Sequence, residues 1–134
     1  MLGELIGEET GKIYGTRVLP YEGGAAKVES SMQATGRLLG VEVTNIATIW
    51  GAIRPDGTLY IEGQGVVMAT DGGSATFVGW GFGRFTPSGG VSYRGAINCP
   101  NATGSLARLN SAIIPFEAEA DAEQNITWRF WEWT

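Results

Sequence analysis

Two glycine-punctuated segments joined by a tight turn constrain the fold of this chain most strongly. They are Leu59–Ala69 (LYIEGQGVVMA) and Ser74–Phe85 (SATFVGWGFGRF), with residues 70–73 between them. Because strand side chains alternate between two faces, this predicted hairpin has one bulky face and one nearly bare face. Alternate glycines weaken a strand unless the chain bends sharply or another group approaches closely. We therefore expect a strongly curved antiparallel sheet.

Six further stretches alternate in the same way between turn residues. They are residues 5–19, with an expected break near Gly7 and Gly11, and residues 27–39, 41–54, 91–99, 111–122 and 125–134. The irregular connection 100–110 has room for a helical turn at residues 106–109. The stretch 111–122 also fits a helix, but Pro115 argues against a helix interior and places a strand there at an edge or a bulge. About eight strands predict an all-β, single-domain, antiparallel up-and-down β-barrel over residues 1–134.

Charge and residue usage exclude several functions. The 134 residues carry 14 acids and 9 bases, a net charge of -5, and no histidine. Without clustered positive charge, we expect neither nucleic-acid binding nor membrane binding. Without histidine, the commonest general base and most zinc or iron sites are absent, and we expect no cofactor and no metal. Gly79, Gly81 and Gly83 lack the spacing of a dinucleotide fingerprint.

Cysteine usage and the N-terminal sequence predict a cytoplasmic protein. Cys99 is the single cysteine, so it has no partner for an intramolecular disulfide, and we expect it to be a buried small hydrophobe. The segment MLGELIGEETGK lacks the features of a signal peptide. No apolar run reaches the roughly 20 residues of a membrane-spanning helix.

A polar group on the bulky face of the central hairpin is the candidate binding site. Its members are Tyr60, Glu62, Gln64, Trp80 and Arg84, with Arg94 on the following strand. If this face lines the barrel, Glu62 is buried and needs Arg84 or Arg94 as a partner. The pair would then bind the polar end of a ligand, or Glu62 would act as a proton-transfer base. The structural alternative is an ion pair or a solvated outer face, which we also expect for Glu117, Glu119 and Asp121.

The C-terminal strand predicts a homo-oligomer. Trp131 and Trp133 share one face of this strand, and Trp128 and Phe130 share the other. A monomeric barrel buries only one face, so the second apolar face calls for a second subunit.

The order of motifs resembles a family of small uncharacterised prokaryotic proteins grouped with the allene oxide cyclase-like, calycin-like barrels. The segments that carry the resemblance are GELIGEETGKIYGTRVL, TGRLLGVEVT, RPDGTLYIEGQGVVM, ATFVGWGFGRF, VSYRGAI and the terminal WEW. The resemblance implies a barrel with a cavity for a small hydrophobic molecule. No catalytic residue of allene oxide cyclase can be matched to a position of this chain, so the resemblance implies no activity.

Three classes of function follow from the sequence. The first is a barrel that binds a small apolar or amphipathic molecule in its cavity. The second is an isomerase or cyclase that holds a reactive hydrophobic substrate in shape, with Glu62 and Tyr60 as its polar participants. The third is a structural or interaction protein with a filled barrel. We favour the first, because the chain lacks histidine and a recognisable nucleophile.

Overall fold

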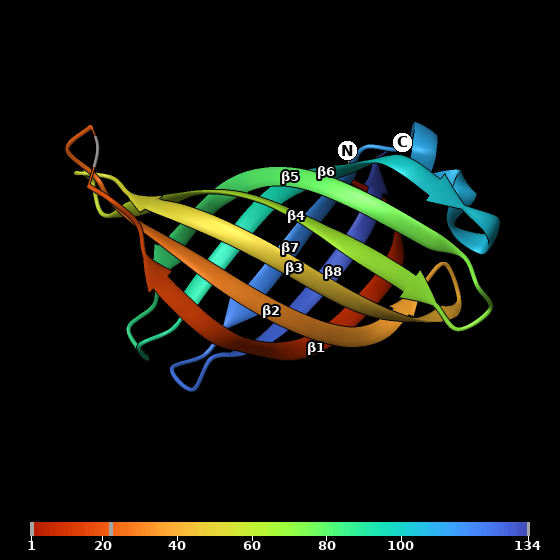
Figure 1. The fold of residues 1–134 in the computed structure, drawn as a ribbon, viewed down its shortest axis with the longest axis horizontal. Helices are drawn as coiled ribbons and strands as arrows, with labels where there is room; N and C mark the ends of the chain where they lie inside the picture. Colours follow the sequence, from red (N-terminus) through yellow and green to blue (C-terminus); the bar gives the residue numbers. More distant parts are fainter. Residues whose placement is uncertain (1, 22, 134) are drawn as a thin grey trace.

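The computed structural model describes residues 2–21 and 23–133. Within these residues, eight strands form one closed antiparallel barrel, in which each strand pairs with the next and β8 pairs with β1 (Figure 1). The elements are β1 (Leu2–Val18), β2 (Ala26–Leu38), β3 (Val41–Ile53), β4 (Thr58–Ala69), β5 (Ser74–Phe85), β6 (Val91–Thr103), the short helix η1 (Gly104–Ser111), β7 (Ile114–Ala120) and β8 (Asn125–Trp133). This confirms the predicted up-and-down barrel.

The predicted strand positions agree with the structure except around β6. This strand continues through Pro100, because the register of β5 and β6 shifts by one residue between the pairs Thr76 with Asn101 and Val78 with Asn98. Such a bulge accommodates a proline inside a strand. The helix that follows is also longer than the expected single turn. Two residues of predicted elements, Glu22 and Thr134, lie outside the described residues.

Pro115 occupies a position in β7 that behaves as an edge. It pairs with Ala96 of β6, but the pairing of β7 with β8 begins one residue later, at Phe116. A residue without a backbone N–H is tolerated where a strand has a neighbour on one side only. The strand interpretation of this stretch is confirmed, and its alternating apolar residues Ile114, Phe116, Ala118 and Ala120 are buried.

The bare, glycine-rich face of the central hairpin is the inside of the barrel. A Cβ added at Gly81 would lie 2.4 Å from the carbonyl oxygen of Arg94 and 2.9 Å from the Cα of Gly95. A Cβ added at Gly65 would lie 2.6 Å from the ring of Phe77. Glycine is required here because neighbouring backbones and core rings occupy the space of a side chain. The side chains that alternate with these glycines therefore point outward.

The two ends of the barrel differ. At one end η1 covers the opening and buries Leu106 and Leu109 completely (Figure 1, right). The side chain of Asn110 fixes this helix to β6 by accepting a hydrogen bond from the N–H of Ala102 and donating one to its carbonyl oxygen, both at 2.8 Å. The opposite end carries the turns β1–β2, β3–β4, β5–β6 and β7–β8. We call these the closed end and the open end.

Replacing Gly81 with alanine should destabilise the barrel by about 1–3 kcal/mol, because the added methyl group meets backbone atoms that cannot move independently. The measurement is urea-induced unfolding followed by tryptophan fluorescence. Gly15→Ala is the matched control, since a Cβ at Gly15 has no atom within 4 Å. This variant should change the free energy of unfolding by less than about 1 kcal/mol, towards higher stability. Equal losses in both variants would contradict the close-approach argument.

Candidate functional site

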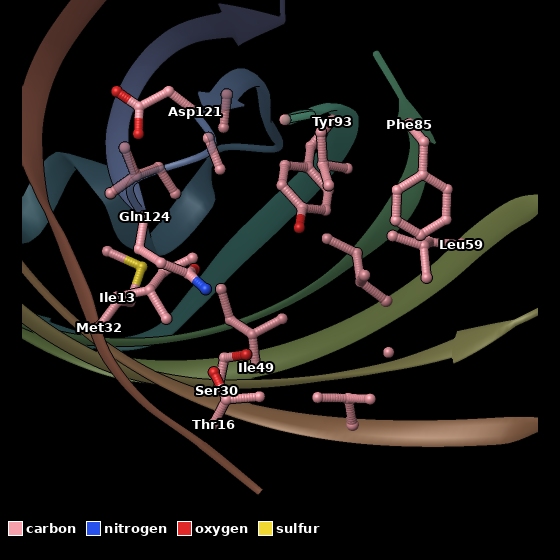
Figure 2. A pocket seen from close by; sticks show the side chains of 18 of the residues that line it. Ile13, Thr16, Ser30, Met32, Ile49, Leu59, Phe85, Tyr93, Asp121 and Gln124 are labelled. Atoms are coloured by element: carbon pink, nitrogen blue, oxygen red, sulfur yellow. The ribbon is translucent and has the colours of Figure 1, made fainter. Parts of the chain in front are cut away.

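A cavity of about 320 Å³ opens at the open end of the barrel. This volume lies at the lower end of the range of about 300–1,000 Å³ that is typical of pockets for small molecules. The walls are mainly apolar and come from β1 to β8 and from the turns of the open end (Figure 2). Apolar lining residues include Ile13, Val28, Met32, Ile49, Ile53, Leu59, Ile61, Phe85, Val91, Phe116, Ile126 and Trp128.

Aromatic packing makes the inner part of the cavity wall rigid. Trp128 of β8 is 4% exposed, and its ring centroid lies 5.6 Å from that of Phe116 and 4.9 Å from that of Phe130. It also meets Phe77 edge to face, at 5.9 Å. Edge-to-face and tilted contacts of this kind add to the stability gained by burying the rings. The cavity therefore has a preformed shape.

Four uncharged polar side chains face the cavity. They are Tyr93 of β6, Gln124 before β8, Ser30 of β2 and Thr16 of β1. In Figure 2 the hydroxyl of Tyr93 and the amide of Gln124 both point into the space between the labelled side chains. Burial raises the pKa of Tyr93, so its hydroxyl stays protonated at neutral pH. The sequence analysis missed these four residues, although Tyr93 alternates with the inward-facing Gly95 and Ile97.

The one carboxylate in the lining, Asp121, serves the turn between β7 and β8. Its Oδ1 accepts hydrogen bonds from the backbone N–H groups of Glu123 and Asn125, both at 2.9 Å, and its Oδ2 accepts one from the side chain of Asn125 at 3.1 Å. The N–H of Asn125, followed by its side chain, holds the pKa of Asp121 below its usual range. Figure 2 shows its carboxylate pointing away from the cavity.

The structure corrects the predicted location of the binding residues. Tyr60, Glu62, Gln64, Trp80, Arg84 and Arg94 all lie on the outer face of β4, β5 and β6, and none of them lines the cavity. The condition that this face lines the barrel is not met, because the glycine-bearing face is the one that neighbouring strands approach on the inside, and the alternative of an outer face is the one that the structure shows. A ligand role for the six residues on the outer surface stays a prediction.

Glu62 lies on the outer face, so the condition under which it would need Arg84 or Arg94 as a partner is not met. Glu62 accepts a hydrogen bond from the hydroxyl of Tyr60 at 2.8 Å, and this bond raises the pKa of the tyrosine. Arg94 instead pairs with Glu117 and Glu119, each at 3.4 Å, on the outer face. These two acids are 39% and 54% exposed, so the expected solvated face is confirmed for them, whereas Asp121, the third acid of that expectation, lies beyond β7 in the turn.

A buried polar pair lies deeper in the barrel, towards the closed end. Asn45 donates a hydrogen bond from Nδ2 to Oε1 of Glu9 at 2.9 Å, and the two residues are 1% and 2% exposed. Glu9 Oε2 and Asn45 Oδ1 have no hydrogen-bond partner among the described residues. They border a void of about 10 Å³, which is too small for an organic ligand. Burial raises the pKa of Glu9 to about 7, against the smaller opposite effect of the Asn45 hydrogen bond.

The alternation of side chains along β1 and β3 indicates that Glu9 and Asn45 face the interior. Period-two alternation leads back from Ile13 to Glu9 on β1, and from Ala47 to Asn45 on β3. The sequence analysis expected β1 to be broken near Gly7 and Gly11, so the alternation was not followed through them. Both glycines lie within the continuous strand.

Other features of the described chain bear on the remaining expectations. Cys99 is buried, as expected, and burial raises its pKa to about 11, which makes the thiol unreactive at neutral pH. Among residues 2–21 and 23–133, no three acidic or cysteine side chains cluster as metal ligands do. No helix in the same ranges is long and apolar enough to cross a membrane.

Comparison with solved structures identifies the fold without a function. The barrel is similar to a protein with unknown function from Clostridium acetobutylicum ATCC 824, with a TM-score of 0.83, 11% identity and 98% of each chain covered. It is similar to a conserved protein of unknown function from Rhodopseudomonas palustris, with a TM-score of 0.82, 10% identity, and 98% of this chain and 97% of that chain covered. A beta-barrel like protein from Acinetobacter baumannii AYE matches with a TM-score of 0.82, 8% identity, and 96% and 93% coverage.

At these identities the likeness shows the fold alone. No protein-family model and no curated protein matches the chain. The protein is thus a small β-barrel whose structural neighbours are themselves uncharacterised. The resemblance to allene oxide cyclase-like barrels is not addressed by these neighbours and stays a prediction.

Replacing Glu9 with glutamine should remove a pH dependence of stability. The pKa of Glu9 is about 7 in the folded chain against 4.5 ordinarily, so the folded state binds its proton more tightly. The stability linked to Glu9 is therefore fully present below about pH 4.5 and is lost as the pH rises to about 7, by about 3 kcal/mol in total. Urea unfolding at pH 4.5 and pH 8 should show this loss in the wild type only.

The difference between the free energies of unfolding of the wild type and Glu9→Gln cancels the contributions of the other carboxylates, including the turn residue Asp121. The glutamine keeps the carbonyl acceptor for Asn45 Nδ2 and adds a donor near Asn45 Oδ1. A wild type whose stability relative to Glu9→Gln is the same at both pH values would show that Glu9 is ionised in the folded barrel.

Proposed function

We propose that the protein binds a small apolar or amphipathic molecule inside its barrel. The observation that carries this proposal is the apolar cavity of about 320 Å³, which is open at one end and closed at the other by η1. Apolar walls left in contact with water cost about 25 cal/mol for each Å². A ligand that covers these walls would recover that free energy and stabilise the folded state.

The family resemblance supports the same proposal, since allene oxide cyclase-like barrels are expected to hold hydrophobic molecules. The alternative function, an isomerase or cyclase, depended on Tyr60 and Glu62 facing the substrate. Both lie on the outer face of the barrel, so neither of the residues proposed for this alternative can reach a substrate in the cavity. Binding is therefore the function that the geometry supports best.

The outer face of the barrel favours a second candidate, an interaction role with another copy of the chain. Six large apolar side chains form what we call the apolar outer face, and each is 42–53% exposed. They are Ile46, Val66, Met68, Val78, Trp80 and Phe82, from β3, β4 and β5. Monomeric proteins rarely expose contiguous apolar patches of this kind. The expected homo-oligomer therefore has a candidate interface on β3, β4 and β5, separate from Trp131 and Trp133 of β8, on which the expectation was based.

Charge complementarity points to a second copy as the occupant of this face. Glu42 lies where β3 begins at the closed end, is 69% exposed and lies 4.0 Å from the guanidinium of Arg37, a long, solvent-exposed ion pair that contact with a second copy could replace. Arg54 lies just beyond β3 at the open end, over the rings of Tyr60 and Phe82 at 5.2 Å and 5.1 Å. A two-fold axis parallel to the face and perpendicular to the strands would place Glu42 of one copy opposite Arg54 of the other. Such an arrangement is self-complementary, as a symmetric dimer requires.

Filling the cavity should abolish ligand binding. In Gly51→Phe the new ring enters the cavity, because Gly51 lines it and a Cβ there makes only ordinary contacts, the nearest at 3.4 Å to Ile61. The probe is N-phenyl-1-naphthylamine, a neutral apolar dye whose fluorescence rises in apolar surroundings. Ala52→Phe is the matched control, since the next residue of β3 points outward. We expect dye binding to be lost in Gly51→Phe and kept in Ala52→Phe, with both variants folded by circular dichroism. Absence of dye binding in the wild type would overturn the proposal.

The dimer proposal predicts that a charge on the apolar outer face produces monomers. Val78 is 45% exposed near the centre of this face, so Val78→Lys should fold normally but oppose association. Sedimentation velocity at micromolar concentration should show a dimer for the wild type and a monomer for this variant. Thr127→Lys places the same charge on exposed β8, away from the face, and should remain dimeric. A monomeric wild type would refute the second candidate function.

A further inference from the structure

The uncharged polar side chains around the cavity are all available to a ligand. The hydroxyls of Tyr93, Ser30 and Thr16 and the side-chain amide of Gln124 face the cavity and make no hydrogen bond to the described part of the chain. Hydroxyl and amide groups can each donate and accept. A ligand with one polar end therefore finds partners for either an acceptor oxygen or a hydroxyl, at the mouth rather than at the inner end.

The charges around the cavity favour a ligand whose polar end is uncharged over one that ends in a carboxylate or an ammonium group. Among the described residues that line it, there is no lysine or arginine, and the single carboxylate, Asp121, is engaged in its own turn. A carboxylate enclosed here would have no counter-charge, and burying an unpaired charge is strongly unfavourable. An ammonium group would likewise face a carboxylate whose oxygens are already engaged and which points away from the cavity.

Gln124 occupies a backbone conformation that favours glycine. Its φ is 71°, in the left-handed region, whereas the other turns of the open end use glycines such as Gly57 and Gly89 for positive φ. A glutamine in this conformation is strained, and strain retained at a cavity mouth is an indication of function. The backbone of Gln124 is fixed by two hydrogen bonds, from its N–H to the carbonyl of Asp121 and from the N–H of Ile13 to its own carbonyl. Its side chain is thereby held over the cavity (Figure 2).

We infer that the ligand is an uncharged apolar molecule with one hydroxyl or carbonyl oxygen, which Tyr93 and Gln124 hold at the mouth of the cavity. This inference rests on the proposed function, because it assigns a chemical class to the ligand of the same cavity. The apolar body of the ligand contacts the walls formed by residues such as Met32 and Phe116. The polar end lies between β6 and the β7–β8 turn, which contribute Tyr93 and Gln124.

The test compares three molecules of equal chain length as competitors for bound N-phenyl-1-naphthylamine at pH 7.5. They are 1-octanol, octanoate and octylammonium, which differ in the charge of the polar end. The expected result is displacement by 1-octanol at a concentration at least tenfold lower than that needed for either ion. Equal or better displacement by octanoate would overturn the inference, since it would require a cationic partner that the cavity lining does not provide.

Two variants test the residues that hold the polar end. Tyr93→Phe removes the hydroxyl, and Gln124→Asn keeps the amide and tolerates the left-handed backbone but shortens the reach of the side chain. Each should weaken competition by 1-octanol three- to tenfold and leave the affinity of the dye unchanged. Gln33→Asn, the same change on the exposed outer face of β2, is the matched control and should alter neither.

The outcomes separate the two proposals. A wild type that fails to bind the dye refutes the proposed function and this inference together. A wild type that binds the dye, and whose Gly51→Phe variant does not, supports the cavity as the binding site. If 1-octanol then shows no advantage over the ions, or if neither Tyr93→Phe nor Gln124→Asn weakens it, the inference fails and the proposed function stands.

Discussion

The close approach of backbones on the inner face of β4, β5 and β6 is the constraint on which the rest of this structure depends. A side chain at Gly81 would overlap the backbone of β6, and one at Gly65 would overlap the ring of Phe77. The absence of side chains at these positions lets the sheet curve tightly, and the curvature allows eight strands to close. Closure pairs the strands into a ring, so the barrel has no free sheet edge along its paired length. The side chains that alternate with these glycines point outward, and the apolar ones among them form the apolar outer face together with Ile46 of β3.

The barrel has a cavity because its two ends differ. Leu106 and Leu109 of η1 fill the closed end, where Phe130 and Ile114 also pack. The open end has only turns, and the cavity extends inward from them to Met32 and Trp128. A barrel of eight strands can be filled by its own side chains or can hold a small ligand. Here the inner half is filled and the outer half is not, because the helix that supplies the filling side chains is present at one end.

The interior has two polar regions with different chemistry. Glu9 and Asn45 are sealed in the filled half, where burial favours the protonated acid and a proton on Oε2 would supply a donor beside the unpaired Oδ1 of Asn45. Tyr93 and Gln124 lie in the open half, where an uncharged ligand can reach them. The sealed pair therefore links stability to pH, and the open pair selects among ligands. Neither region needs a buried counter-ion, in agreement with a chain that turns its charged side chains outward.

The class of fold and most strand positions could be predicted from the sequence, because period-two alternation and turn residues are local signals. The alternation of Ile114, Phe116, Ala118 and Ala120 indicated a buried face, and Pro115 indicated an edge-like position; the structure confirms both. The sequence did not determine which face of the central hairpin lies inside, since bulky residues suit a core as well as an outer surface. Only the tertiary structure decided this, through contacts such as that of Gly81 with the backbone of β6, which join residues on different strands. The cavity, and the presence of both Tyr93 and Gln124 in its lining, depend on barrel closure, and no local pattern encodes either.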